Sequence, residues 1–172
     1  MTYDVLLTEA QIQRRIDELA DLIRADYGDN PVLLVGILKG SFIFIADLVR
    51  RLGENVSVDF VQVRSYGEGM TSDGNVQIRK DLDVNIRDVD VLIVEDIVDS
   101  GATLNHLLEL LRTRGPRSLK VVALLSKPAA RRVQVQTDYV GFEIPNDFVV
   151  GYGLDLAEKY RNLTCIASLR QD

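Results

Sequence analysis

The sequence predicts an α/β protein with a mainly parallel, twisted sheet flanked by helices. The runs at residues 32–38 and 91–94 are continuously apolar, and the run at 119–125 is interrupted only by Lys120. Such runs are typical of strands that are covered on both faces. Segments with apolar residues at helical spacing lie between these runs. Strands that alternate with helices in this order form parallel sheets, and the connecting helices pack on the sheet faces.

Length and composition are those of an ordinary globular protein. The chain has 172 residues, of which 47% are hydrophobic and 27% are charged. One domain of this length buries a full core, so we expect a single domain over residues 1–172. The formal net charge of −6 argues against a general nucleic-acid or anionic-membrane binder.

Two helices are predicted in the first third of the chain. Thr8 begins the first helix, because Gln11 three residues later completes a capping-box pattern, and residues 27–31 end it. Its apolar residues at helical spacing are Ile12, Ile16, Leu19, Ala20 and Ile23. The second helix follows residues 39–41 and stops at Gly53. Its predicted apolar face contains Phe42, Ile45, Ala46, Val49 and Leu52.

Two strands and a loop are predicted next. Residues 56–63 alternate as in a strand, and a change of phase between Phe60 and Val61 predicts a β-bulge at that point. Residues 65–74 contain three glycines and no apolar periodicity, which predicts a mobile loop. A short strand follows at residues 76–78.

The last elements are one helix and several strands. The helix begins near Thr103 and stops at Gly115, and its predicted inward residues are Leu104, Leu107, Leu108 and Leu111. After the apolar run at 119–125, short strands are predicted at residues 139–144, 148–152 and 163–169.

The first residues and the single cysteine indicate a cytoplasmic protein. Cys165 lies in an apolar run and is expected to be a buried, inert thiol. The N-terminus lacks the basic and apolar regions of a secretion signal. No apolar run approaches the roughly 18–20 residues that a membrane helix needs.

Polar residues follow three of the predicted strands, and ligands of open parallel sheets bind beyond these carboxyl ends. Lys39, Gly40 and Ser41 follow the first strand, an acidic segment follows the strand at 91–94, and Ser126 and Lys127 follow the strand at 119–125. We therefore expect these three segments to meet at one edge of the sheet.

The segment Asp99-Ser100-Gly101-Ala102-Thr103 lies between a strand and a helix. Glycine lets the backbone approach a ligand closely, and the amides of a helix N-terminus attract phosphate. The alternative is that Asp99 or Ser100 only caps the helix. The preceding pair Glu95 and Asp96 favours a site, because a cap needs one acceptor and an acidic pair suits ribose hydroxyls or Mg²⁺. Together these features describe a ribose-5-phosphate site.

The segment at 91–104, VLIVEDIVDSGATL, resembles the phosphoribosyl-pyrophosphate (PRPP) signature of the type I phosphoribosyltransferases. Its acidic pair and the residues that follow are similar to the hypoxanthine-guanine branch of that family. Residues 38–41 resemble the family's pyrophosphate loop, and residues 141–155 resemble its purine pocket. The resemblance implies a PRPP-binding core at about 30–130 and, mainly at 135–172, a small hood that is formed with both chain ends.

The resemblance implies transfer of 5-phosphoribosyl from PRPP to N9 of a 6-oxopurine, with IMP or GMP and pyrophosphate as products. Residues 99–103 (Asp99, Ser100, Gly101, Ala102 and Thr103) then hold the 5-phosphate, although many members of the family have lysine in place of Ala102. Glu95 and Asp96 bind the ribose hydroxyls, directly or through Mg²⁺. Asp99 is implied to be the catalytic acid or base at purine N7.

The resemblance also assigns the other ends of the substrates. Lys127, Phe148 and Val149 contact the purine. Asp155 borders the purine pocket and binds a second Mg²⁺, and Lys39, Gly40 and Arg161 contact pyrophosphate. A cis peptide is expected at Leu38-Lys39, and Ser65 and Tyr66 begin a lid that excludes water. A homodimer or homotetramer is implied.

Other interpretations remain open at this point. Xanthine or guanine are alternatives to hypoxanthine as the preferred base. An RNA-binding regulator needs a basic face, and the candidate residues are Arg112, Arg114, Arg117, Arg131 and Arg132. A phospho-accepting receiver domain would use the acidic pair but would leave residues 100–103 without a role. The only histidine, His106, is interpreted as a helix residue that packs beside the phosphate loop.

Overall fold

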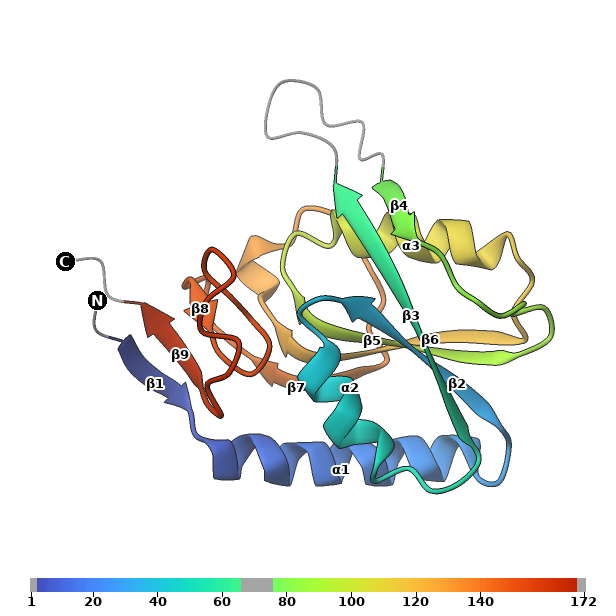
Figure 1. The fold of residues 1–172 in the computed structure, drawn as a ribbon, viewed down its shortest axis with the longest axis horizontal. Coiled ribbons are helices and arrows are strands. Elements are labelled where there is room, and N and C mark those ends of the chain that lie inside the picture. The colour runs from blue at the N-terminus through green and yellow to red at the C-terminus, as the bar shows by residue number, and fades with distance from the viewer. Residues whose placement is uncertain (1–2, 66–75, 170–172) are drawn as a thin grey trace.

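The computed structural model describes residues 3–65 and 76–169 and contains two sheets (Figure 1). The larger sheet has six strands in the order β4-β3-β2-β5-β6-β7. All neighbours in it are parallel except β3 and β4, which are antiparallel. Its strands are β2 (Val32–Leu38), β3 (Val56–Ser65), β4 (Val76–Lys80), β5 (Asp90–Val98), β6 (Ser118–Ser126) and β7 (Tyr139–Glu143).

Helices cover both faces of this sheet, as the apolar runs predict. Helices α1 (Glu9–Tyr27) and α2 (Phe42–Val49) lie on one face and α3 (Ala102–Arg112) lies on the other (Figure 1). Buried side chains form one apolar cluster under α1 and α2 and a second under α3. In β2, Leu34 belongs to the first cluster and Val35 to the second, so neither face of this strand meets water.

The first helix follows its sequence signals closely. Thr8 Oγ1 accepts a hydrogen bond from the amide of Gln11, and the side chain of Gln11 accepts one from the amide of Thr8, which is the predicted capping box. The five predicted apolar residues of α1 are all buried. In α3 the four predicted leucines are buried as well.

The second helix corrects the prediction. It ends at Val49, and its buried side chains are Phe44, Ile45 and Leu48, whereas Phe42 remains 43% exposed. Nearly every residue of this segment is apolar, so periodicity alone does not identify the inward face.

The predicted bulge in β3 lies elsewhere. The strand keeps its register with β2 through Gln62, and the irregularity falls between Gln62 and Val63 in the pairing with β4. Phe60 packs on one apolar cluster and Val61 on the other. The change of phase in the sequence therefore reflects a strand that is covered on both faces, not a bulge at Phe60.

The smaller sheet joins the two ends of the described chain. Strands β1 (Tyr3–Leu7), β9 (Ile166–Leu169) and β8 (Val149–Val150) pair antiparallel in the order β1-β9-β8 (Figure 1). The sequence patterns did not predict β1. Cys165 directly precedes β9 and is partly exposed, so the expectation of a fully buried thiol is wrong.

Candidate active site

Strand β5 carries the acidic segment further into the sheet than predicted. The strand continues to Val98, and its residues pair with β6 as far as Val98 opposite Ser126. Glu95 and Asp96 therefore lie within the last part of the strand rather than after it. On one side Glu95 pairs with Ala123 of β6, whereas the pairing with β2 already ends at Gly36 opposite Val94.

Glu95 and Asp96 form a pair of crowded carboxyl groups. Glu95 Oε1 accepts a hydrogen bond of 3.2 Å from the amide of Asp96, and Asp96 Oδ1 accepts one of 2.7 Å from the amide of Ile97. Desolvation and the neighbouring Asp96 raise the pKa of Glu95 well above its usual range, and desolvation raises the pKa of Asp96. Within the described residues, no lysine or arginine forms an ion pair with either. The pair thus favours binding of a proton, a cation or hydroxyl donors.

The turn between β5 and α3 has the form of a phosphate cradle. Gly101 precedes the first helical residue and has a φ of +82°, with no side-chain cap on the helix. A Cβ added to Gly101 would lie 2.7 Å from the carbonyl oxygen of Val133, so only glycine fits there. Asp99 accepts a hydrogen bond from the amide of Ser100 instead of capping α3. Ser100 Oγ accepts a hydrogen bond of 3.3 Å from the amide of Ala102, the first helical residue. The N-cap residue itself is Gly101, so neither Asp99 nor Ser100 occupies that position.

The cradle faces an open hollow. Its lining includes side chains that the sequence assigned to ribose and phosphate: Glu95, Asp99, Ser100, Gly101 and Thr103. Since free amides of the first helical turn also point toward this end of α3, the hollow offers hydroxyl and amide donors beside carboxylate acceptors. Such a combination binds a phosphorylated sugar.

A second hollow adjoins the first on the side of β6 and β7. Asp99 and Ser100 line both hollows, and Arg131 and Asn146 line the second. Lys127 lies at the end of β6, where its amide donates a hydrogen bond of 2.9 Å to the carbonyl of Val98. Its side chain is only 8% exposed. Lys127 is therefore not a solvated surface lysine.

Arg131 is a residue of this region that the sequence did not single out for the site. Its Nη2 atom donates a hydrogen bond of 2.8 Å to Ser126 Oγ, and its Nη1 atom is buried and has no partner in the part of the chain that the structure describes. Its side chain also lies beside Gly101. Its one signal in the sequence is its place four residues after Lys127, in a loop whose path the sequence does not reveal.

The loop after β2 completes the centre of the site. The peptide bond Leu38-Lys39 is cis, as expected. A Cβ added to Gly40 would lie 1.7 Å from Asp96 Oδ2, and one added to Gly153 would lie 2.1 Å from the carbonyl oxygen of Gly40. Gly40 is therefore packed between the acidic pair and the loop that follows β8. These contacts bring three separate chain segments together.

The loop at residues 151–162 supplies further charged groups. Arg161 donates to the carbonyl of Gly153 at 2.7 Å and pairs with Asp155 at 3.1 Å. Its Nε atom is buried and has no partner within the described residues. The positive charge of Arg161 also acts on Asp96, whose pKa it lowers against the effect of desolvation. Arg161 therefore stands between the acidic pair and Asp155.

The structure describes the predicted purine-binding residues but only one of the two predicted lid residues. Phe148 is 55% exposed and Val149 is 5% exposed, so Phe148 is free to stack on a ligand and is not a core residue. Ser65 ends β3, and Tyr66 lies outside the described residues. Within the described part of the chain, no three Asp, Glu, His or Cys side chains converge on one metal position. Asp155 therefore stands apart from Glu95 and Asp96.

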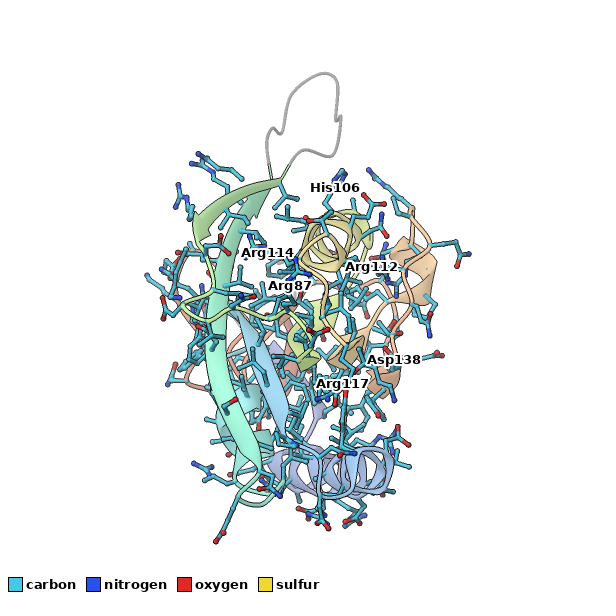
Figure 2. All side chains as sticks on the ribbon, turned by 90° about the vertical axis from the view of Figure 1, so that its right-hand side faces the viewer. Arg87, His106, Arg112, Arg114, Arg117 and Asp138 are labelled. Carbon is cyan, nitrogen blue, oxygen red and sulfur yellow. The ribbon has the colours of Figure 1, made fainter. Side chains whose placement is uncertain are left out.

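Three of the arginines considered for an RNA-binding face, Arg112, Arg114 and Arg117, lie at the opposite end of the sheet (Figure 2). The other two, Arg131 and Arg132, line the second hollow of the site. Arg114 forms two bonds with Asp81, and Arg117 pairs with Asp90 at 3.1 Å. His106 is partly exposed on α3 (Figure 2). In residues 3–65 and 76–169, no helix is long and apolar enough to cross a membrane.

The fold and this site define an α/β protein with a glycine turn and two crowded carboxyl groups at the carboxyl edge of its sheet, an arrangement that suits a phosphorylated ribose. Comparison with known proteins agrees with that class. The model of the family "Phosphoribosyl transferase domain" matches residues 2–157. The chain belongs to this family.

Individual relatives identify the branch. The chain is 47% identical to the hypoxanthine-guanine phosphoribosyltransferase of Bacillus subtilis, with 96% of this chain and 92% of the relative covered. It is 50% identical to the bifunctional protein TilS/HprT of Listeria innocua, of which it covers 26%. A crystal structure of the hypoxanthine phosphoribosyltransferase of Staphylococcus aureus superposes with a TM-score of 0.94 at 48% identity, covering 97% of this chain and 91% of that one. Within the family the chain thus groups with the hypoxanthine-guanine phosphoribosyltransferases, and the predicted resemblance is confirmed.

Proposed function

We propose that the chain transfers a 5-phosphoribosyl group from PRPP to N9 of hypoxanthine or guanine in purine salvage. The bond between ribose C1 and the pyrophosphate oxygen breaks, and a bond between C1 and purine N9 forms. The products are IMP or GMP and pyrophosphate. The observation that carries this proposal is the pairing of a glycine turn before α3 with the crowded carboxyls of Glu95 and Asp96 on one strand end. It fits a phosphate and a sugar diol at adjacent positions.

The sugar phosphate binds at the turn before α3. The amides of the first turn and the hydroxyls of Ser100 and Thr103 hold the 5-phosphate, and Ala102 contributes its backbone only. The positive φ of Gly101 supports this assignment, because it opens the cradle to an anion without a side chain in the way. Glu95 and Asp96 bind the two ribose hydroxyls, which donate hydrogen bonds to their carboxylates.

The base binds beside the second hollow. Lys127, at the end of β6, donates to the 6-oxygen of the purine, and Phe148 stacks on the ring while Val149 contacts it through the backbone. Asp99 lines both hollows, so it lies between the sugar and the base. Its carboxylate takes the N7 proton of the base as N9 attacks C1.

The leaving pyrophosphate binds at the opposite side of the ribose. The backbone of Lys39 and Gly40 and the guanidinium of Arg161 contact it. The close packing of Gly40 against Asp96 and Gly153 supports this placement, because it joins the loop after β2 to the loop that contains Arg161. The lid that begins at Ser65 and Tyr66 excludes water, which would otherwise hydrolyse PRPP.

Mg²⁺ fits the donor set on the acidic edge. Glu95 and Asp96 present carboxylate oxygens without a cationic partner among the described residues, and Mg²⁺ prefers one or two carboxylates, water and substrate phosphates as ligands. Asp155 provides a separate carboxylate toward a second ion. When bound, Mg²⁺ neutralises charge on the pyrophosphate of PRPP and so makes it a better leaving group.

The remaining features of the proposal concern the molecule as a whole. Residues 30–130 provide the PRPP half and residues 135–172 the purine half of one domain. We propose that the protein acts in the cytoplasm as a homodimer or homotetramer. Light scattering at micromolar concentration that finds only a 19.2 kDa species would exclude the oligomer.

Pyrophosphate release tests the reaction directly. The protein is incubated with PRPP and Mg²⁺ and with hypoxanthine, guanine, xanthine or adenine in parallel. Release with a 6-oxopurine but not with adenine is the expected result, and the same plate ranks the bases. Absence of release with every base would refute the proposed transfer, even if PRPP binds.

A further inference from the structure

The carboxylate of Glu158 occupies the pyrophosphate end of the proposed site. Glu158 Oε2 lies 3.1 Å from Lys39 Nζ and 3.2 Å from Arg161 Nη2. These two cations come from different loops, one after β2 and one after β8. A single acidic side chain therefore bridges the guanidinium that the proposed function assigns to pyrophosphate and the ammonium group of Lys39, whose backbone is assigned to the same ligand.

The backbone holds Glu158 in an unusual conformation. Its φ is +64°, and that of the preceding Ala157 is +50°, a region that few residues other than glycine adopt. The amide of Glu158 donates a hydrogen bond of 2.8 Å to Asp155 Oδ2, and residues Leu156 and Lys159 exchange hydrogen bonds across the turn. Uncommon backbone conformations of this kind are concentrated at functional sites.

The bridge is exposed and therefore exchangeable. The side chain of Glu158 is 64% exposed and that of Lys39 is 55% exposed, whereas that of Arg161 is 19% exposed. Exposed ion pairs contribute little free energy because water and salt screen them. The pairing lowers the pKa of Glu158, mainly through Lys39 and then through Arg161, so the carboxylate is ionised at neutral pH. A pyrophosphate group carries several negative charges and competes effectively for the same two cations.

We propose that Glu158 is an internal competitor for pyrophosphate. In the free protein it neutralises Lys39 and Arg161, it yields both cations when the pyrophosphate group of PRPP binds, and it returns to them as pyrophosphate leaves. Glu158 is thus a positioning residue that lowers affinity for the product and promotes its release. This inference rests on the proposed function, because it requires Arg161 and the loop of Lys39 to bind pyrophosphate. It adds the ammonium group of Lys39 to the backbone contact that the proposed function gives this residue.

Removal of the charge should strengthen pyrophosphate binding. Glu158→Gln keeps the size and the backbone amide but loses the competing charge. Because two exposed ion pairs are removed, we expect magnesium pyrophosphate to bind about three- to tenfold more tightly. The KM for PRPP should fall by a similar factor, whereas kcat should stay constant or fall because the product leaves more slowly. If Glu158 only stabilised the loop, its substitution would instead weaken the binding of both PRPP and pyrophosphate.

Isothermal titration of magnesium pyrophosphate into the intact protein measures this effect. Glu18→Gln is the matched control, since Glu18 is 54% exposed and pairs with Arg15 at 2.6 Å on α1, far from the site. Glu158→Asn is a second variant, because asparagine tolerates a positive φ and so removes the charge without disturbing the turn. Tighter binding by both Glu158 variants with no change in Glu18→Gln supports the competitor.

Three results would overturn the inference, and they are distinguishable from one another. Equal or weaker binding by both Glu158 variants, with normal binding by the wild type, refutes the competitor alone. Equal tightening in Glu18→Gln assigns the effect to net charge. No pyrophosphate binding by the wild type or any variant refutes the assignment of Lys39 and Arg161, and the proposed pyrophosphate site fails together with its competitor.

Discussion

The two ends of the large sheet use charged residues in opposite ways. At the end that Figure 2 faces, acidic groups have matched partners: Asp90 accepts from Ser118 at 2.6 Å and from Arg117 at 3.1 Å, and Asp81 binds Arg114 through both oxygens. At the other end, Glu95 and Asp96 accept backbone amides and crowd each other. Among the described residues, neither this pair nor the buried Lys127 forms an ion pair.

This difference separates charges that serve folding from charges that serve a ligand. Ion pairs and hydrogen bonds satisfy the first group within the chain. The charges at the end with Glu95 and Asp96 are desolvated or repel one another, and no partner within the fold compensates this unfavourable free energy. Such unpaired charges persist where a ligand supplies the missing partner.

The largest expected effect comes from the unpaired end. Asp99→Ala should keep the fold and PRPP binding but reduce turnover at least about 100-fold, because the proton acceptor at the base is lost. Steady-state kinetics and a PRPP titration measure the two effects separately. Asp90→Asn is the control at the paired end and should retain turnover. Near-normal turnover in Asp99→Ala would remove Asp99 from the catalytic role.

A methyl group added at Gly40 should disturb the proposed pyrophosphate site, because it crowds Asp96. In Gly40→Ala the new Cβ meets Asp96 Oδ2 at 1.7 Å, so either the loop or the carboxylate must move. We expect magnesium pyrophosphate affinity to fall about tenfold or more, because a shift of about 1 Å in a positioned group has effects of this size. Calorimetric titration measures the affinity.

Gly28→Ala provides the control at the paired end. Its added Cβ meets no atom within 4 Å, although the φ of +55° carries a backbone cost. It should lower the melting temperature and leave pyrophosphate affinity unchanged. If both glycine variants lose affinity equally, the packing of Gly40 is not the cause.

The two ends also differ in how far the sequence reveals them. Helix α1 and strand β2 were predictable because short-range patterns define them, and the acidic pair with its glycine turn is one continuous motif. By contrast, β1 pairs with β9 near the other end of the chain, and five residues with little alternation give no local sign of it. The inward face of α2 was predicted only in part: Ile45 is buried as expected, but Phe42 is exposed, because nearly every residue of this helix is apolar.

The same distinction applies within the site. Glu95, Asp99 and Gly101 could be singled out as candidates from the sequence because they lie between a predicted strand and a predicted helix, and their roles stay predictions. Arg131 and Glu158 were not, because their positions depend on irregular loops whose paths are set by contacts between distant segments. Such loops carry function but little periodic signal.

Loss of a charge should have opposite effects on stability at the two ends of the sheet. Glu95→Gln removes one of two crowded carboxyls, so we expect the melting temperature to rise by roughly 2–4 °C, the shift for about 1 kcal/mol at this size. Asp90→Asn should lower it by a similar amount, because Ser118 and Arg117 lose an ionised acceptor. Calorimetry without Mg²⁺ tests both. A loss of stability in both variants would mean that the crowded carboxyls also serve folding.

The smallest effect concerns the acid sensitivity of the paired end. The hydroxyl of Tyr139 donates to Asp26, which also pairs with Lys120 at 3.4 Å. These partners, Tyr139 first, lower the pKa of Asp26 below its ordinary value of 3.8. A lowered pKa in the folded state stabilises the protein above pH 3.8, and this contribution disappears as pH falls through the lowered pKa.

Tyr139→Phe removes the main cause and keeps the buried ring. The melting temperature should therefore fall less between pH 7 and pH 3 in the variant than in the wild type, with turnover at pH 7 unchanged. The difference should be small, because Asp26 is exposed to solvent and retains Lys120. An identical decrease in both proteins would show that the bond from Tyr139 does not distinguish the folded from the unfolded state of Asp26. The hydrogen bond from Tyr139 to Asp26 would then be present in the structure without contributing to the stability of the folded protein.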